Sequence, residues 1–145
     1  REVPTSLARV DFFHWVLVDL PPSVTAVAAG EFSDGVVPRG RGGPESRHGS
    51  RQGLNDYTAW FAQDHDMAGD YFGYDGPCPP WNDALIHHYQ FAVHALDLER
   101  LPLEGRFGGP QVLAAMQGHV LARATITGSY TLNPRPAGGA AAASP

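Results

Sequence analysis

Two histidines and a tyrosine carry the chemistry that this sequence offers. His14 lies within the apolar run DFFHWVLVDL, and His87 and Tyr89 open a second apolar run directly after the loop GYDGPCPP. Because successive side chains of a strand point to opposite faces, His87 and Tyr89 share one face and His88 points away from it. If His14 comes from a neighbouring strand, the three side chains can line one pocket.

These groups suit the binding of a small anion. Imidazole and phenol groups donate hydrogen bonds, and loops that contain glycine expose backbone N–H groups in anion-binding concavities. Neither segment contains arginine, so hydrogen bonds would hold the anion. Aromatic walls would come from Phe12, Phe13, Tyr74 and Trp81. The sequence therefore predicts a site for a phosphate or a carboxylate.

Other interpretations stay open. A histidine within a strand is most often a core residue with satisfied nitrogens, which is how we interpret His94 and His119. A metal site would use His14, His87 and His88, or the DHD segment at 64–66. A metal- or histidine-dependent hydrolase would use His14 and His87. The H-E-x-x-H, paired-cysteine and G-x-S-x-G patterns are absent from the sequence. A structural or partner-binding β domain needs no site. We expect no metal, no cofactor and no enzymatic activity.

Composition indicates one soluble globular domain. The chain has 145 residues, of which 43% are hydrophobic and 17% charged, and its apolar runs are too short to span a membrane. All ten basic residues are arginine, against fifteen acidic residues, so the net charge of -5 argues against a nucleic-acid partner. The single cysteine, Cys78, gives no information on compartment. We expect a cytoplasmic protein, with a periplasmic or exported one as the alternative, and no particular oligomeric state.

A predominantly β fold must position the candidate residues. Alternation and β-branched content predict strands over 11–20, 87–99 and 119–132, the first buried on most of both faces and the second half-buried. Pro110 and Gly118 bracket the one predicted helix. Segment 56–64 fits either a helical turn or a strand stub.

Two further segments are predicted to lack regular structure. Residues 30–56 are rich in glycine without periodicity, so they form a long loop in which Arg39, Arg41, Arg47 and Arg51 are solvated. Residues 134–145 offer no amphipathic face, so we expect a disordered tail after a domain over 1–133.

Five segments, taken in order, resemble the phosphatidylethanolamine-binding protein family, in particular its bacterial Raf-kinase-inhibitor-like branch. They are FFHWVLVDLPP, NDY, GYDGPCPP, HHYQFAVHALDLERL and LAAMQGHVLARATITGSY, and the resemblance runs from about Pro4 to Leu132. It implies an antiparallel β-sandwich with a C-terminal helix. It also implies a ligand such as a phosphorylated head group or side chain, allows a protein partner such as a kinase, and implies no reaction.

The resemblance also assigns individual residues to an anion pocket. His14 matches the histidine of the first family motif, and the second motif matches Gly76, Cys78, Pro80, His87 and Tyr89. Where the family has Asp-Pro-Asp-x-Pro this chain has REVP, which aligns Glu2 with the second aspartate and Pro4 with the proline. The resemblance thus implies a first aspartate before Arg1 and upstream strands outside this chain. Without them, sheet edges and apolar surface should be exposed.

Overall fold

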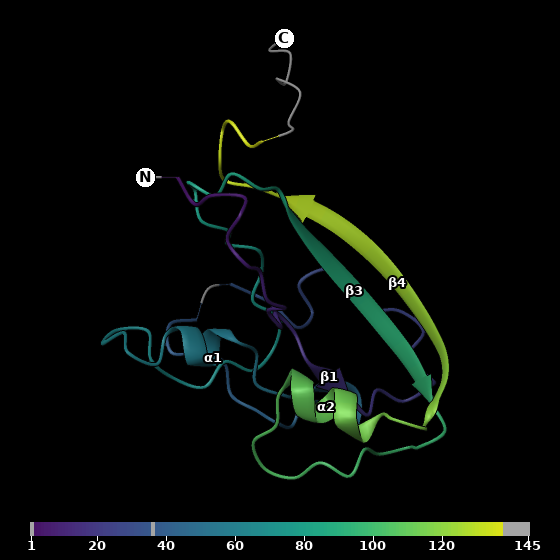
Figure 1. Cartoon of the computed structure of the whole chain (residues 1–145). Coiled ribbons are helices and arrows are strands. Elements are labelled where there is room, and N and C mark those ends of the chain that lie inside the picture. The colour runs from purple at the N-terminus through teal and green to yellow at the C-terminus, as the bar shows by residue number, and fades with distance from the viewer. Residues whose placement is uncertain (1, 36, 138–145) are drawn as a thin grey trace. The chain divides into compact units, whose positions relative to one another are not determined.

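The computed structural model of the protein describes residues 2–35 and 37–137 (Figure 1). The chain divides into two units. Unit 1 consists of Arg1–Asp11, Pro77–His94 and Arg123–Pro145, and unit 2 of Phe12–Gly76 and Ala95–Ala122. Residues 138–145 of the predicted tail lie outside the described residues, so the disorder of that tail stays a prediction.

Unit 2 contains a very short antiparallel sheet. Strand β1, Leu17–Val18, pairs with β2, Arg51–Gln52, with Leu17 opposite Gln52. The prediction of a strand over 11–20 is therefore wrong in extent, because the glycine-rich loop supplies only two pairing residues. Val16 and Val18 are buried, while the residues next to them are partly exposed, so this segment buries one face instead of both.

Three helical segments accompany this sheet. The 3₁₀ turn η1 spans Arg47–Gly49, α1 spans Tyr57–Trp60 and α2 spans Gly109–Ala115. Helix α1 shows that segment 56–64 is a helical turn, and α2 confirms the predicted helix. The Gln111 side chain accepts the Gly108 N–H at 3.0 Å and so satisfies a donor at the start of α2. The hydrophobic core of unit 2 consists of Val16, Val18, Leu101, Leu103, Phe107, Val112 and Met116.

A buried ion pair holds β2 against the core segment. The Arg51 side chain is only 5% exposed, and its Nε lies 2.5 Å from Asp19 Oδ2. The guanidinium also donates to the carbonyls of Leu101 and Leu103, while Asp19 accepts the Leu101 N–H at 2.9 Å. A buried cation requires a counter-charge and satisfied donors, and both are present here. The prediction of a solvated Arg51 is wrong.

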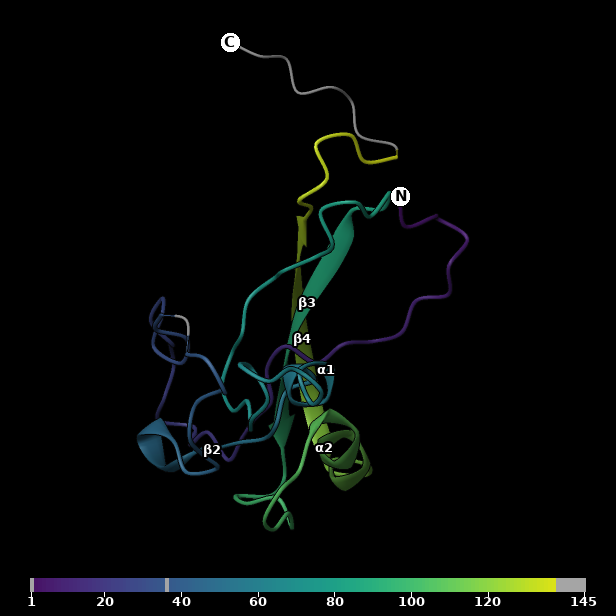
Figure 2. The same ribbon diagram turned by 90° about the vertical axis from the view of Figure 1, so that its left-hand side faces the viewer.

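The second sheet consists of two long strands. Strands β3, His87–Leu96, and β4, Val120–Tyr130, pair with each other, and their arrows run in opposite directions in Figure 1. They lie side by side in Figure 2 as well. Both predicted strands are confirmed, and the fold is mainly β with antiparallel sheets, as predicted.

The burial predicted for the second strand is wrong. Phe91 and Val93 on β3 are exposed, and Ile126 on β4 is 73% exposed. Within the described ranges, β3 and β4 pair only with each other, so no third strand shields their side chains. As for membrane insertion, no helix in the described part of the chain is long and apolar enough to cross a bilayer.

Candidate anion-binding site

His14 lies in unit 2, in the extended segment that leads into β1. Its Nδ1 is 2.8 Å from the carbonyl oxygen of Asp75, and because a carbonyl only accepts, Nδ1 is the donor. The ring packs against Phe12 and Tyr57, with centroids 4.9 Å and 5.4 Å away. These contacts fix both the orientation and the tautomer of this partly exposed imidazole.

The loop that contains Gly76 is anchored by polar side chains of unit 2. Asn55 Nδ2 donates to Asp75 Oδ2 at 2.7 Å, and Arg41 Nη1 lies 2.9 Å from Asp75 Oδ1. The Tyr57 hydroxyl donates to the Gly76 carbonyl at 3.1 Å. Arg41 is therefore held by an ion pair, which corrects the prediction that it is a solvated loop residue. The Gly76 carbonyl therefore accepts a hydrogen bond from within the protein.

Glu2 and Pro4 lie in unit 1, beside the segment that precedes β3. The Val3 N–H donates to the Asn82 carbonyl at 2.8 Å, and the Ala84 N–H donates to the Val3 carbonyl at 3.2 Å. This short bridge pins the REVP segment, and the Glu2 and Pro4 residues on either side of Val3 are exposed.

Cys78 and Pro80 lie in the proline loop of unit 1. Both residues are exposed. The Pro80 carbonyl accepts the Asp83 N–H at 3.0 Å, which makes a tight turn directly before Asp83. The turn therefore sets the position of the residue that contacts His87.

A buried carboxylate orients His87. The Asp83 side chain is 1% exposed and accepts from Arg9 at 2.5 and 2.9 Å, from the Leu85 N–H at 3.0 Å and from His87 Nε2 at 2.8 Å. Burial alone would raise the pKa of Asp83, but these donors outweigh it and hold the pKa well below its usual range. Asp83 is therefore ionised at neutral pH.

Tyr89 lies next to His87 along β3. The two rings have centroids 6.4 Å apart and an interplanar angle of 24°. This stacking places both side chains on one side of the strand, as the period of two predicts. His88, the residue between them, is exposed.

The predicted site residues thus form two groups. His14 and Gly76 belong to unit 2, whereas Glu2, Pro4, Cys78, Pro80, His87 and Tyr89 belong to unit 1. The structure describes each group by itself, and their convergence on one pocket stays a prediction.

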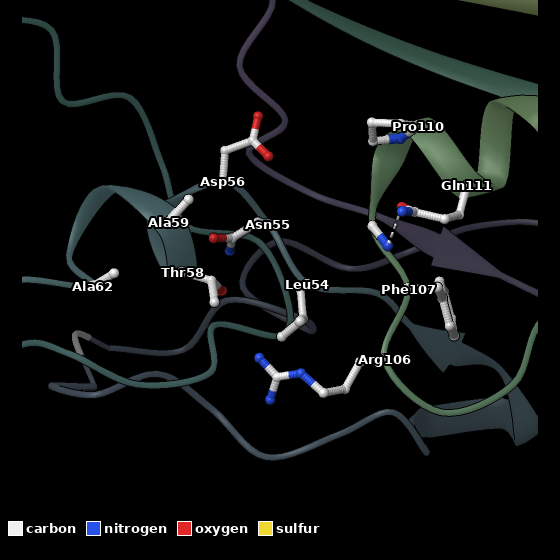
Figure 3. Close-up of a pocket in the computed structure, with 11 residues that line it drawn as sticks. Leu54, Asn55, Asp56, Thr58, Ala59, Ala62, Arg106, Phe107, Pro110 and Gln111 are labelled. Carbon is white, nitrogen blue, oxygen red and sulfur yellow. Dashed lines mark hydrogen bonds between the residues drawn. The ribbon is translucent and has the colours of Figure 1, made fainter.

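An open groove of about 520 Å³ lies within unit 2 (Figure 3). Polar side chains that line it make hydrogen bonds and ion pairs within the protein. Residues of α1 line one side, and Phe107, Pro110 and Gln111 line the other. Thr58 Oγ1 accepts the Tyr71 N–H at 3.0 Å, and Arg106 is paired with Asp70. None of the predicted site residues lines this groove, so it does not form part of the candidate site.

A second pocket, of about 430 Å³, lies within unit 1. Its lining comes from both ends of the chain and from the proline loop: Glu2, Trp81, Asn82, Asn133, Pro134 and Arg135. Glu2 is the one predicted site residue among them. The wall of the pocket contains a carboxylate, a guanidinium and an indole.

Sequence reasoning missed the residues that hold the candidate side chains in place. Asp83 contacts His87 and is itself paired with Arg9. The Asp75 carbonyl contacts His14, and the Asp75 side chain accepts from Asn55. An acid four residues before His87 was the only sequence signal for the first pair. Arg9 lies 74 residues from Asp83, and no local pattern reports such a contact.

Metal ligation receives no support from the described side chains. Residues 2–35 and 37–137 contain no group of three or more histidine, cysteine, aspartate or glutamate side chains placed to hold a metal ion.

The lowered pKa of Asp83 predicts a dependence of stability on pH. An unfolded aspartate titrates near pH 3.9, so the stabilisation by Asp83 is complete above about pH 5 and is lost as the pH falls through the lower, folded value. Denaturant unfolding of the wild type and of Asp83→Asn between pH 7 and pH 2.5 measures it. The difference between their unfolding free energies should shrink below pH 4 by up to about 1.4 kcal/mol per pH unit.

Glu31 makes this comparison necessary, because its pKa is also lowered, first by the Ala28 N–H and then by His48. Glu31 titrates equally in both proteins, so it cancels in the difference. A constant difference down to pH 2.5 would show that Asp83 is not the linked group.

The comparisons with known proteins define the family. The family model described as phosphatidylethanolamine-binding protein matches residues 2–131. The chain therefore belongs to the phosphatidylethanolamine-binding protein family, which confirms the resemblance seen in the sequence.

Several relatives are longer proteins. The chain is 35% identical over 117 residues to a UPF0098 protein of Methanothermobacter thermautotrophicus, covering 81% of this chain and 61% of that protein. It is 32% identical over 123 residues to the UPF0098 protein YbcL of Escherichia coli, covering 83% and 55%. A crystal structure of a putative phosphatidylethanolamine-binding protein homolog from Chlamydia trachomatis matches with a TM-score of 0.56 and 29% identity, covering 82% of this chain and 57% of that one. This chain spans roughly half to two thirds of these relatives.

Proposed function

We propose that this chain is a non-enzymatic binding module for a small phosphate-bearing anion. The observation that carries the proposal is the state of His87, which is partly exposed, held at one ring nitrogen by an ionised Asp83 and stacked with Tyr89. Imidazole and phenol groups at adjacent positions on one side of a strand suit the oxygens of a phosphate. Membership of a family named for a phospholipid supports this ligand class.

The remaining residues of the proposal come from the family resemblance. His14, Gly76, Cys78 and Pro80 are assigned to the same function, with Glu2 and Pro4 in place of the family's acidic motif. A phosphorylated head group and free phosphate share the chemistry that such a site would recognise, so both serve as probes.

The test is stabilisation of the protein by phosphate ligands. Inorganic phosphate and phosphoethanolamine, each added at about a hundred times its dissociation constant, should stabilise the protein by roughly 2.7 kcal/mol. His87→Ala should abolish this stabilisation, because it removes the proposed donor. His88→Ala is the matched control, since His88 is the exposed neighbour on the other face of β3, and it should respond as the wild type does.

The pH dependence separates anion binding from a general salt effect. A protonated imidazole binds an anion more strongly, so the shift in Tm should grow as the pH falls from about 7.5 to 6. Chloride at equal ionic strength should produce no such shift. Equal responses of His87→Ala and the wild type at both pH values would exclude His87 as the ligand-binding group. Failure of both phosphate ligands to raise Tm would overturn the proposed function.

A further inference from the structure

The carboxylate behind His87 has no freedom to rotate or to take up a proton at neutral pH. Both oxygens of Asp83 are occupied: Oδ1 accepts from Arg9 Nη2 and the Leu85 N–H, and Oδ2 accepts from Arg9 Nη1 and His87 Nε2. Arg9 comes from the N-terminal segment of unit 1 and is partly exposed, while Asp83 is buried. The acceptor presented to His87 is therefore fixed in position and in charge.

A fixed, ionised acceptor decides which nitrogen of His87 carries the proton. Because a carboxylate only accepts, the Nε2 atom at 2.8 Å must be the donor. A neutral imidazole has one N–H, so Nδ1 is then the nitrogen without a proton. Nδ1 makes no hydrogen bond with the residues that the structure describes, and the side chain is 30% exposed. Nδ1 is therefore the ring nitrogen available to a ligand.

We propose that Asp83 is a positioning residue that fixes the tautomer of His87, so that His87 presents Nδ1 to the ligand and binds an anion only together with a proton. This proposal rests on the proposed function for its ligand. An unprotonated Nδ1 repels the lone pairs of a phosphate oxygen, whereas Nδ1–H of the imidazolium donates to one. The proton comes from solvent, or from a phosphate monoester, whose second ionisation lies near pH 6.

The other groups that face this pair do not supply the proton. Asp83 and Arg9 form one ion pair behind the imidazole, so together they are close to neutral. The phenol of Tyr89 stacks beside the ring. Near neutral pH, the proton that accompanies the anion therefore resides on His87 or on the ligand.

The first experiment reads the tautomer directly in the whole chain. Two-bond ¹H–¹⁵N spectra of ¹⁵N-labelled protein at pH 8, where histidines are ordinarily neutral, distinguish Nε2–H from Nδ1–H. We expect His87 in the wild type as the Nε2–H form. Inorganic phosphate added at pH 6 should then move the Nδ1 resonance of His87. The Nδ1–H form in the wild type would overturn the proposal, without any variant having to fold.

The second experiment removes the carboxylate. In Asp83→Asn the neutral His87 should populate both tautomers, and the Nδ1–H tautomer can donate to a phosphate oxygen without an added proton. The affinity for inorganic phosphate should therefore change less between pH 6 and pH 8 than it does in the wild type. Removal of a negative charge alone would raise the affinity at both pH values and leave this difference in place. An unchanged pH dependence in Asp83→Asn would therefore overturn the assignment.

Matched variants separate positioning from general damage. Asp97→Asn breaks a different histidine–carboxylate contact, between His119 Nδ1 and Asp97 Oδ1 at 2.8 Å, and should leave phosphate affinity unchanged. Arg9→Gln leaves Asp83 in place, so His87 should keep its Nε2–H form; a switch of tautomer there would assign the role to Arg9 and overturn the proposal for Asp83. If the wild type shows Nε2–H but phosphate does not raise Tm, the proposed function fails while the control of the His87 tautomer by Asp83 is supported.

Discussion

Replacing Asp19 with asparagine is expected to lower the free energy of unfolding by about 3–5 kcal/mol. The Arg51 cation would remain in the core of unit 2 without its counter-charge. One amide oxygen also cannot replace a carboxylate that accepts from both Arg51 Nε and the Leu101 N–H, and the amide NH₂ would face one of these donors. Asparagine tolerates the positive φ of 60° at this position, so backbone strain adds little. Denaturant unfolding monitored by tryptophan fluorescence measures the loss.

An exposed ion pair provides the control. Asp70 pairs with Arg106, but these side chains are 44% and 61% exposed, so Asp70→Asn should cost well under about 1 kcal/mol. The double variant Asp19→Asn/Arg51→Met should regain part of the loss, because it removes the uncompensated charge. Equal effects of Asp19→Asn and Asp70→Asn would show that the Arg51 pair is solvated.

Asn55→Ala should destabilise the protein by about 2–4 kcal/mol and loosen the loop that holds Gly76. The Asn55 side chain donates to the Gly73 carbonyl at 3.0 Å and to Asp75 Oδ2 at 2.7 Å, and it accepts the Tyr57 N–H at 3.1 Å. Asn55 is 1% exposed, so in the alanine variant the Gly73 carbonyl, the Asp75 carboxylate and the Tyr57 N–H would each lose a hydrogen-bond partner. Unfolding by denaturant measures the destabilisation.

Hydrogen exchange tests the local part of this prediction. The Asp75 N–H donates to the His14 carbonyl at 3.1 Å, and its exchange should accelerate in Asn55→Ala more than the global destabilisation requires. Gln111→Ala, which removes a single bond to the Gly108 N–H, should cost about 1 kcal/mol and leave Asp75 protected. Unchanged Asp75 exchange in Asn55→Ala, relative to the global loss, would mean that the loop is held by other contacts.

The local parts of the fold could be predicted from sequence. Alternation located β3 and β4, and Pro110 with Gly118 located α2, because each pattern reflects contacts within a few residues. The extent of β1 could not be predicted in this way. A strand is only as long as its partner, and the partner of β1 is a two-residue segment within an irregular loop.

The same distinction applies to the candidate site. The shared face of His87 and Tyr89 follows from strand geometry alone, and their ring stacking agrees with it. The environment of each histidine depends on residues far away in sequence, such as Arg9 for His87 and Asp75 for His14. Arg51 illustrates the same limit: its Gly- and Ser-rich neighbours indicated solvent, whereas a distant aspartate and two carbonyls bury it.

The Arg51 cluster has a consequence for synthesis of the chain. Asp19 accepts the N–H of Leu101, 82 residues later, and Arg51 reaches carbonyls 50 and 52 residues ahead. A ribosome delivers these partners in order, so β1, β2 and the Asp19–Arg51 pair emerge well before the Leu101 and Leu103 carbonyls that accept from Arg51. Unit 2 therefore cannot complete these contacts until Leu103 has left the exit tunnel, and until then its first half lacks the segment that covers Arg51.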